Sequence, residues 1–307
     1  MEITLSLLLI ILILYWIYLY QKYKIEHFTE INSEDLPTDI WMYWENKDRN
    51  EKPTYIKMCY ETILNNVGNR FKVHLLDEKT IYDYLPKLRK DLDKKLHRIP
   101  MKADYIRYSL LYKYGGIWLD SDVIVFRNLD DLIEKLKEVE YVGFGCHNNG
   151  SQCTDIMNGY PKPANWVMIS RKKSKLLKYM LKDADELLNK NNSSYFEKYY
   201  HSLGRNLLWD CIQKVKQSDE NWDYLHMSSK CVERDSKGNK ITNSRSISIE
   251  NIDEYCSSKI YFLPIYNTAP GFPDWFLKMS KKEILNSNIL VSKFFRKAYK
   301  NFLIEKF

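Results

Sequence analysis

Apolar and polar positions separate the chain into an N-terminal apolar run and a longer segment with alternating strand and helix periods. Residues 3–20 read ITLSLLLIILILYWIYLY, 18 positions without a charged side chain, which approaches the length that spans about 30 Å of hydrocarbon. Aromatic residues crowd the end of this run and Lys22 and Lys24 follow it, as at a membrane boundary. A cleaved signal peptide would start with basic residues and end in small ones, whereas Glu2 precedes this run. We therefore expect residues 1–24 to be a single-pass transmembrane anchor, and the lysines favour a cytosolic body.

A polar stem at residues 25–37 precedes short apolar runs that alternate with segments of helical period, which predicts an α/β fold with a mostly parallel central sheet. Pro53 stands at a helix start, where its missing N–H is harmless, and Gly68 follows the end of that helix. Residues 217–258 are polar and irregular, so we expect a lid or a disordered insert there. The expected strands are 39–44, 71–77, 117–126, 140–146, 165–170 and 259–264. The expected helices are 53–66, 80–85, 101–114, 130–138, 173–189 and 195–216, the last interrupted near Gly204.

The C-terminal tail, residues 278–307, is strongly basic. It holds eight Lys or Arg against two Glu, which is +6 of the formal net charge of +7. A basic amphipathic helix of this kind lies on an anionic membrane surface, which is the interpretation we favour. The alternative is that its apolar face packs onto the body while the lysines are solvated. The residues that recur on this face are Val291, Phe294, Phe295, Ala298 and Phe302.

Composition narrows the class of protein further. Hydrophobic residues make up 45% of the chain and charged residues 28%, which suits a globular body with a sizeable core. The six cysteines include no C-x-x-C pair, so we expect no structural zinc site and mostly free thiols. The basic charge lies in the tail and not around aromatic platforms, which argues against nucleic-acid binding.

The stretch 103–126, ADYIRYSLLYKYGGIWLDSDVIVF, carries the candidate chemistry. If its end is one continuous strand, Asp120 and Asp122 share a face while Ser121 points to the other. Two carboxylates that close repel each other, and a divalent cation removes the conflict. Carboxylate ligands suit Mg²⁺ or Mn²⁺, which would keep positions open for a diphosphate and neutralise its charge. Two solvated acids are the ordinary alternative, but acids at the end of an apolar strand imply a bound partner.

A helix and a Gly-Gly turn precede this motif. Asp104 and Arg107 are three residues apart and share a helix face. They form either an ordinary ion pair or a site in which the carboxylate accepts from sugar hydroxyls and the guanidinium donates to sugar or phosphate oxygens. Gly115 and Gly116 allow a tight turn from helix into strand. Trp44 ends the first strand, where an indole either stacks on a nucleotide base or belongs to the core.

The pattern A-D-x-x-R-Y-x-x-L-Y-x-x-G-G-x-W-x-D-x-D resembles the signature of glycosyltransferases with the DXD sugar-binding region. That group includes yeast-type initiating mannosyltransferases and bacterial capsular-polysaccharide synthesis proteins. The resemblance extends over about Leu36 to Gly145 and implies a GT-A fold, a Rossmann-like nucleotide-sugar-binding fold, in a catalytic domain at residues 38–277. It also implies hexose transfer from a nucleotide-sugar donor to a glycan, lipid-linked or protein acceptor, with retention of anomeric configuration. Many such enzymes lie in the ER or Golgi lumen, so the side of the membrane stays open.

The resemblance further implies roles for the acids and the arginine. Asp122 matches the direct metal ligand, and Asp120 matches the acid that contacts the ribose and the metal shell. Asp104 and Arg107 match the donor-sugar contacts.

It implies roles for aromatic and amide side chains as well. Trp44 matches the residue that stacks on the nucleotide base, and Trp118 stands where an aromatic side chain packs beside the donor. Asn165 resembles the asparagine that follows the motif in the family. The sequence departs from the family at Trp41, where histidine is frequent, so the base pocket is expected to differ. The nearest candidates for the family's C-terminal His or Trp elements are Tyr266, Asn267 and Trp275.

Two other functions fit parts of the sequence. A haloacid-dehalogenase-type phosphatase has D-x-D-x-[TV] after an apolar strand, and WLDSDV fits this with Asp120 as the nucleophile. That assignment leaves the Gly-Gly turn and the D-x-x-R helix unexplained. A catalytically dead, membrane-anchored binding protein is the non-enzymatic alternative.

Overall fold

The computed structural model describes residues 10–19, 35–46, 51–145, 156–157, 160–228, 261–265 and 274–305. The chain divides into two compact units, Met1–Leu36 and Pro37–Phe307, which we describe one at a time. In the first unit, residues 10–19 form a helix with exposed apolar side chains. No helix within the described ranges is both long and apolar enough to span a bilayer. The rest of the predicted anchor lies outside those ranges.

A mixed six-stranded sheet forms the centre of the second unit, in the order β2-β1-β3-β8-β5-β9. Strand β8 runs antiparallel to both of its neighbours, and the other pairings in this sheet are parallel. The predicted α/β class is therefore confirmed, with one reversed strand in an otherwise parallel sheet. The strands are β1 (Asp39–Tyr43), β2 (Lys72–Leu76), β3 (Gly116–Leu119), β5 (Tyr141–Gly145), β8 (Ala164–Ser170) and β9 (Leu225–Ser228).

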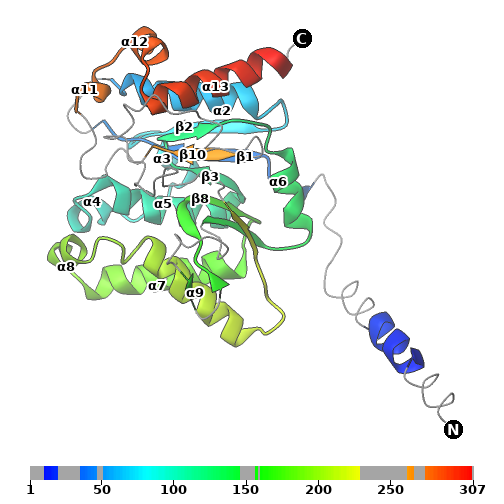
Figure 1. Ribbon diagram of the computed structural model, residues 1–307. Helices are drawn as coiled ribbons and strands as arrows, with labels where there is room; N and C mark the ends of the chain where they lie inside the picture. Colours follow the sequence, from blue (N-terminus) through cyan, green and yellow to red (C-terminus); the bar gives the residue numbers. More distant parts are fainter. Residues whose placement is uncertain are drawn as a thin grey trace. The chain divides into compact units, whose positions relative to one another are not determined.

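Helices cover both faces of this sheet (Figure 1). One face carries α5 (Ile99–Tyr114), α7 (Lys175–Lys190) and α9 (Arg205–Ser218), whose apolar sides form one core with β1 and β3. The other face carries α2 (Thr54–Asn66) and α13 (Leu290–Glu305), which form a second core. Shorter helices are α3 (Ile81–Tyr84), α4 (Leu92–Lys95), α6 (Asp130–Glu134), η2 (Lys135–Lys137), α8 (Ser193–Lys198), α11 (Asp274–Leu277) and α12 (Lys281–Asn286). Two further strand pairs are β4 (Val123–Val125) with β10 (Phe262–Pro264) and β6 (Ile156–Met157) with β7 (Tyr160–Pro161).

The connection from α5 to β3 depends on two glycines, as the sequence predicts. Gly115 and Gly116 have φ values of 73° and 101°, a region that side chains with a Cβ rarely adopt. A Cβ at Gly116 would lie 2.2 Å from the backbone oxygen of Asp39. The second glycine therefore also allows β1 and β3 to approach each other.

The predicted strand at 117–126 is wrong as a single element. Strand β3 ends at Leu119 and β4 starts at Val123, so Asp120 and Asp122 lie in the turn between them. The hydroxyl of Ser121 donates to the backbone oxygen of Tyr43 at 2.7 Å, which fixes this turn to the end of β1. Strand β4 then leaves the central sheet and pairs with β10. Asp120 and Asp122 are therefore not alternate residues of one strand, so the prediction that they share a strand face is wrong.

The basic tail packs against the body, which is the alternative to the membrane-surface helix that we favoured. Its Phe294 and Phe295 are 5% and 0% exposed and belong to the core that contains α2. The amide nitrogen of Asn66, on α2, donates to the backbone oxygen of Ala298 at 3.4 Å. The phenylalanine face is therefore not free to enter a lipid surface. The side chain of Phe302 lies outside the description.

Some predictions fall outside the described residues. Cys59 and Cys211 are free and buried, as expected, but the other four cysteines are not described. Of the predicted lid or insert at 217–258, only the part up to residue 228 is described. Tyr266 and Asn267 are likewise outside it.

Candidate active site

The guanidinium of Arg107 is the centre of a buried polar cluster at the end of β3. Its side chain is 3% exposed. Nη2 donates to Oδ1 of Asp120 at 2.7 Å, and Nη1 lies 3.1 Å from Oδ1 of Asp104. Nη1 also donates to the backbone oxygen of Asn165. One cation thus joins α5, the turn after β3 and the start of β8.

Trp118 and Asn165 complete this cluster, which we call the Arg107 network. The indole N–H of Trp118 donates to Oδ1 of Asp120 at 2.8 Å, and Cζ of Arg107 lies 4.9 Å from the indole centroid. The amide nitrogen of Asn165 donates to Oδ1 of Asp104 at 2.8 Å. The structure therefore brings together five residues that the sequence predicts as site residues, from three stretches of the chain.

Burial sets the electrostatics of the network. It raises the pKa of Asp104 to about 7, although the neighbouring charge of Arg107 lowers it, and the charge of Asp120 adds to the rise. Burial also raises the pKa of Asp120, while Arg107 and the indole hydrogen bond of Trp118 lower it. Two carboxylates share one guanidinium here, so the network has more negative than positive groups.

Asp122 and Trp44 are placed differently. The backbone oxygen of Asp122 accepts from the N–H of Ile265 at 2.9 Å. Its charge, after the larger effect of burial, raises the pKa of the Cys59 thiol on α2. Trp44 follows β1, is partly buried against the second core, and donates from its indole to Oδ1 of Asn46 at 2.8 Å. The described contacts do not place Trp44 in the Arg107 network.

Gly204 borders the network, and sequence reasoning saw it only as a helix break. A Cβ at this position would lie 2.8 Å from Oδ2 of Asp104 and 3.1 Å from the amide nitrogen of Asn165. The hydroxyl of Tyr108 donates to the backbone oxygen of Leu203 at 2.7 Å. This bond fixes the turn before α9 against α5. The sequence signal that could have identified this position is a glycine at a predicted helix interruption.

A second buried charge pair lies at the end of β1 and was missed. Nζ of Lys102 lies 2.6 Å from Oε1 of Glu45 and 2.8 Å from Oδ1 of Asp93. The hydroxyl of Tyr43 donates to the same oxygen of Glu45. Since Ser121 binds the backbone oxygen of Tyr43, this pair supports the strand end beside the DXD turn.

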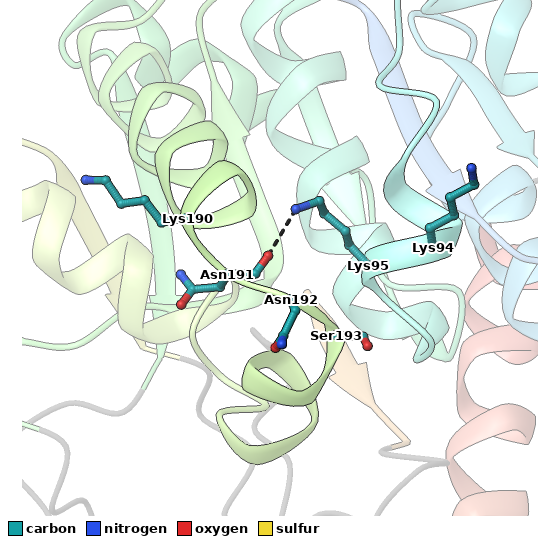
Figure 2. Close-up of a pocket in the computed structure, with 6 residues that line it drawn as sticks. All are labelled: Lys94, Lys95, Lys190, Asn191, Asn192 and Ser193. Carbon is teal, nitrogen blue, oxygen red and sulfur yellow. Dashed lines mark hydrogen bonds between the residues drawn. The ribbon is translucent and has the colours of Figure 1, made fainter.

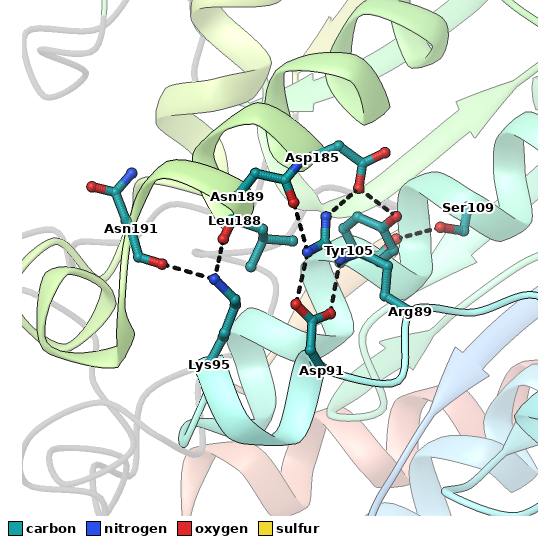
Figure 3. A network of polar contacts seen from close by, with 9 residues as sticks. All are labelled: Arg89, Asp91, Lys95, Tyr105, Ser109, Asp185, Leu188, Asn189 and Asn191. Atoms are coloured by element: carbon teal, nitrogen blue, oxygen red, sulfur yellow. Dashed lines mark hydrogen bonds and ion pairs between the residues drawn. The ribbon is translucent and has the colours of Figure 1, made fainter.

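Asp185 on α7 is the centre of a polar cluster that contacts α5 and the segment before α4 (Figure 3). Arg89 donates to both carboxylate oxygens of Asp91, at 2.9 and 2.8 Å, and to Oδ1 of Asp185 at 2.9 Å. The hydroxyl of Tyr105 donates to the same oxygen of Asp185 at 2.9 Å. Because Tyr105 follows Asp104, this cluster fixes the helix turn that carries the Asp104 carboxylate.

A cavity of about 540 Å³ lies between α4 and the junction of α7 and α8. Figure 2 shows Lys95 reaching the backbone oxygen of Asn191, a contact of 3.0 Å. This cavity shares no residue with the Arg107 network. It is lined by Lys94, Lys95, Lys190, Asn191, Asn192 and Ser193.

The family model for capsular polysaccharide synthesis proteins matches residues 17–257 of this chain. The chain belongs to this family. Across 206 residues the family member is 26% identical to an uncharacterized glycosyltransferase, L373, of Acanthamoeba polyphaga mimivirus, which covers 64% of this chain and 66% of the viral protein. It is 59% identical to inositol phosphoceramide mannosyltransferase 3 of Schizosaccharomyces pombe over 32 residues, 10% of this chain and 9% of the yeast protein. The chain thus spans at most about two thirds of these relatives.

Two solved structures with some likeness to this family member are named as glycosyltransferases. The apo form of mouse xyloside xylosyltransferase 1 has a TM-score of 0.41 at 13% identity, covering 76% of this chain and 99% of the mouse chain. The PaToxG glycosyltransferase has a TM-score of 0.38 at 13% identity, covering 60% of this chain and 72% of the other.

The two acids of the DXD turn are the candidate ligands for a cation. Within the described ranges, no group of three or more His, Cys, Asp or Glu side chains is placed to hold a metal ion. Asp120 uses Oδ1 for both Arg107 and Trp118 and its side chain is 33% exposed, so Oδ2 lies outside these contacts. Asp122 is also partly exposed. Carboxylate oxygens are the type of ligand that Mg²⁺ or Mn²⁺ prefers.

Proposed function

We propose that the chain is a metal-dependent glycosyltransferase that transfers a hexose from a nucleotide-sugar donor to a glycan, lipid-linked or protein acceptor, with retention of configuration. Family membership supports the reaction class. The observation that carries the proposal is the position of Arg107, which joins Asp104, Asp120 and Asn165 in one buried cluster. The guanidinium orients both carboxylates, and the side chain of Asp120 is 33% exposed, which suits charge-assisted contacts with a bound sugar phosphate.

In this proposal, different residues of the network bind different parts of the donor. Asp104 and Asn165 accept from and donate to sugar hydroxyls, since their polar groups meet at one point. Arg107 orients both carboxylates and donates to sugar or phosphate oxygens. Mn²⁺ or Mg²⁺, held by Asp120 and Asp122, would supply neutralisation of the charge on the leaving nucleoside diphosphate.

The remaining binding groups flank this network. Trp44 lies just beyond the end of β1 and stacks on the nucleotide base, for which its partly exposed indole is suited. Trp118 packs beneath the guanidinium and keeps it in place. Membrane association through residues 1–24 also belongs to this proposal, with the side of the membrane left open. No nucleic-acid partner is proposed.

The direct test is a screen of nucleotide sugars for hydrolysis or transfer by the full chain, with and without Mn²⁺ or Mg²⁺. We expect turnover of at least one donor only with metal, and Asp122→Asn should abolish it without lowering the melting temperature. Asp83→Asn, on the exposed side of α3, is the matched control and should keep full turnover. Proton NMR of the product gives the anomeric outcome.

The rival functions give different results in the same samples. A phosphatase would release phosphate from aryl phosphates and would bind a beryllium fluoride mimic at Asp120. A dead binding protein would show no metal-dependent thermal shift with any nucleoside diphosphate. Either result, together with no donor turnover, would refute the proposal.

A further inference from the structure

Two cations lie over one tryptophan beside the Arg107 network. Nζ of Lys162 is 4.1 Å from the indole centroid of Trp209, and Cζ of Arg205 is 5.4 Å from it. The indole N–H of Trp209 donates to the backbone oxygen of Pro163 at 2.8 Å. This bond ties α9 to the segment before β8 and holds the ring that both cations share.

Among the described residues, neither Lys162 nor Arg205 has a carboxylate within ion-pair distance. Burial raises the pKa of Asp210, and Asp183 adds to the rise, while Lys214 and, more weakly, Lys162 oppose it. Arg205, after burial, lowers the pKa of His201. Both cations are at least partly exposed, so their donors can reach a ligand.

The two cations stand next to the residues that border the network. Arg205 follows Gly204, where an added Cβ would meet the carboxylate of Asp104 and the amide of Asn165. Lys162 precedes Pro163, which lies two residues before Asn165. Arg107 contacts Asp104 through Nη1 and Asp120 through Nη2. Both cations are therefore joined through the backbone to the glycine and the asparagine at the Asp104 end of the network.

We propose that Lys162, Arg205 and Trp209 form an acceptor subsite for a sugar that carries an anionic group, either a carboxylate or a phosphate. This inference rests on the proposed transferase function. Two like charges that share one ring repel each other, because they lie within about one screening length at 0.1 M salt. An anion between them relieves this repulsion, and a guanidinium binds carboxylate or phosphate with two parallel hydrogen bonds. The indole fixes the position of both donors.

The test measures binding of three acceptor probes to the full chain: glucuronic acid methyl glycoside, glucose 6-phosphate methyl glycoside and the neutral methyl glucoside. Isothermal titration with wild type should show tighter binding of the first two than of the third. Lys162→Gln and Arg205→Gln should each weaken the binding of the acidic probes by about threefold to fivefold. This is the range expected for the loss of one partly exposed ion pair. The carboxylate and phosphate arms show which anion is preferred. Lys113→Gln, which removes a cation over Tyr114 at the far end of α5, is the matched control and should bind like wild type.

Donor hydrolysis without acceptor separates this inference from the proposed function. We expect both glutamine variants to hydrolyse the donor as wild type does. If wild type lacks donor hydrolysis, the transferase proposal fails. The anionic subsite is refuted if donor hydrolysis is intact but wild type binds neutral and acidic probes equally. It is also refuted if the glutamine variants weaken the binding of all three probes alike. It is also refuted if the variants change the KM of a nucleotide uronate donor and leave acceptor binding unchanged.

Discussion

Replacing Arg107 with methionine removes the only cation that the described structure places between Asp104 and Asp120. The arginine side chain is 3% exposed, so water cannot take its place without opening the core. Breaking a buried ion pair by removing one partner costs about 3–5 kcal/mol, because the remaining charge is left without compensation. We expect Arg107→Met to lower the free energy of unfolding by about this amount at pH 8.

The loss should depend on pH, with a sign that follows from the raised pKa of Asp104. Burial already raises this pKa to about 7 while Arg107 opposes the rise, so the variant should raise it further. In the folded variant, Asp104 then keeps its proton, whereas in the unfolded chain it releases the proton above its ordinary pKa of about 4. Up to about pH 7, Asp104 lowers the stability of wild type and variant alike as the pH rises, and above that pH only the variant continues to lose stability. The cost of Arg107→Met should be smaller at pH 5 than at pH 8.

Urea unfolding at pH 5, 6.5 and 8, followed by tryptophan fluorescence, measures both effects. Arg89→Met is the matched control, because Arg89 also contacts two aspartates but is 20% exposed. Hydrogen bonding to Arg89 lowers the pKa of Asp91, so that contribution is complete at pH 5 and constant up to pH 8. The reasoning is refuted if Arg107→Met costs less than about 1 kcal/mol, or if its cost is equal at pH 5 and pH 8.

Three further predictions concern the surroundings of the site. Gly204→Ala should raise the donor KM and leave binding of the free nucleoside diphosphate unchanged, because the new Cβ would meet the Asp104 carboxylate at 2.8 Å; equal losses for both ligands would contradict this. Lys102→Met should cost about 3–5 kcal/mol in urea unfolding, whereas the double variant with Glu45→Met should recover most of it; an additive double variant would show that the pair is not coupled. Phe295→Ala should lower stability by about 3–5 kcal/mol without changing binding to anionic vesicles, since the ring is fully buried; a change confined to vesicle binding would restore the membrane-surface interpretation.

The sequence was sufficient for elements whose signals are local. Helix α5 could be predicted from apolar residues at helical spacing, and its end from Gly115 and Gly116, since only glycine readily takes the positive φ values found there. Asp104 and Arg107 could be paired because helical spacing places residues three apart on one face. The structure confirms this contact.

Features that depend on distant parts of the chain could not be predicted in this way. The apolar residues on both sides of the DXD motif look like one strand, but β4 pairs with β10 from near the C-terminus. The bond from Ser121 to Tyr43 fixes the break. The face of α13 that we assigned to a membrane is equally apolar in both interpretations, and only its partner α2 decides between them.

The charge of the site gives a stronger reason to expect a bound metal ion than the expected single strand at residues 117–126 did. Arg107 already compensates one of the carboxylates that contact it, so burial of Asp120 alone does not require a cation. The network contains two carboxylates and one guanidinium, and an anionic donor diphosphate would add to this excess. Repulsion between like charges in a partly buried site is large enough to oppose binding. A divalent cation at the DXD turn would make the net charge that the diphosphate meets positive. We therefore expect donor turnover to depend on metal.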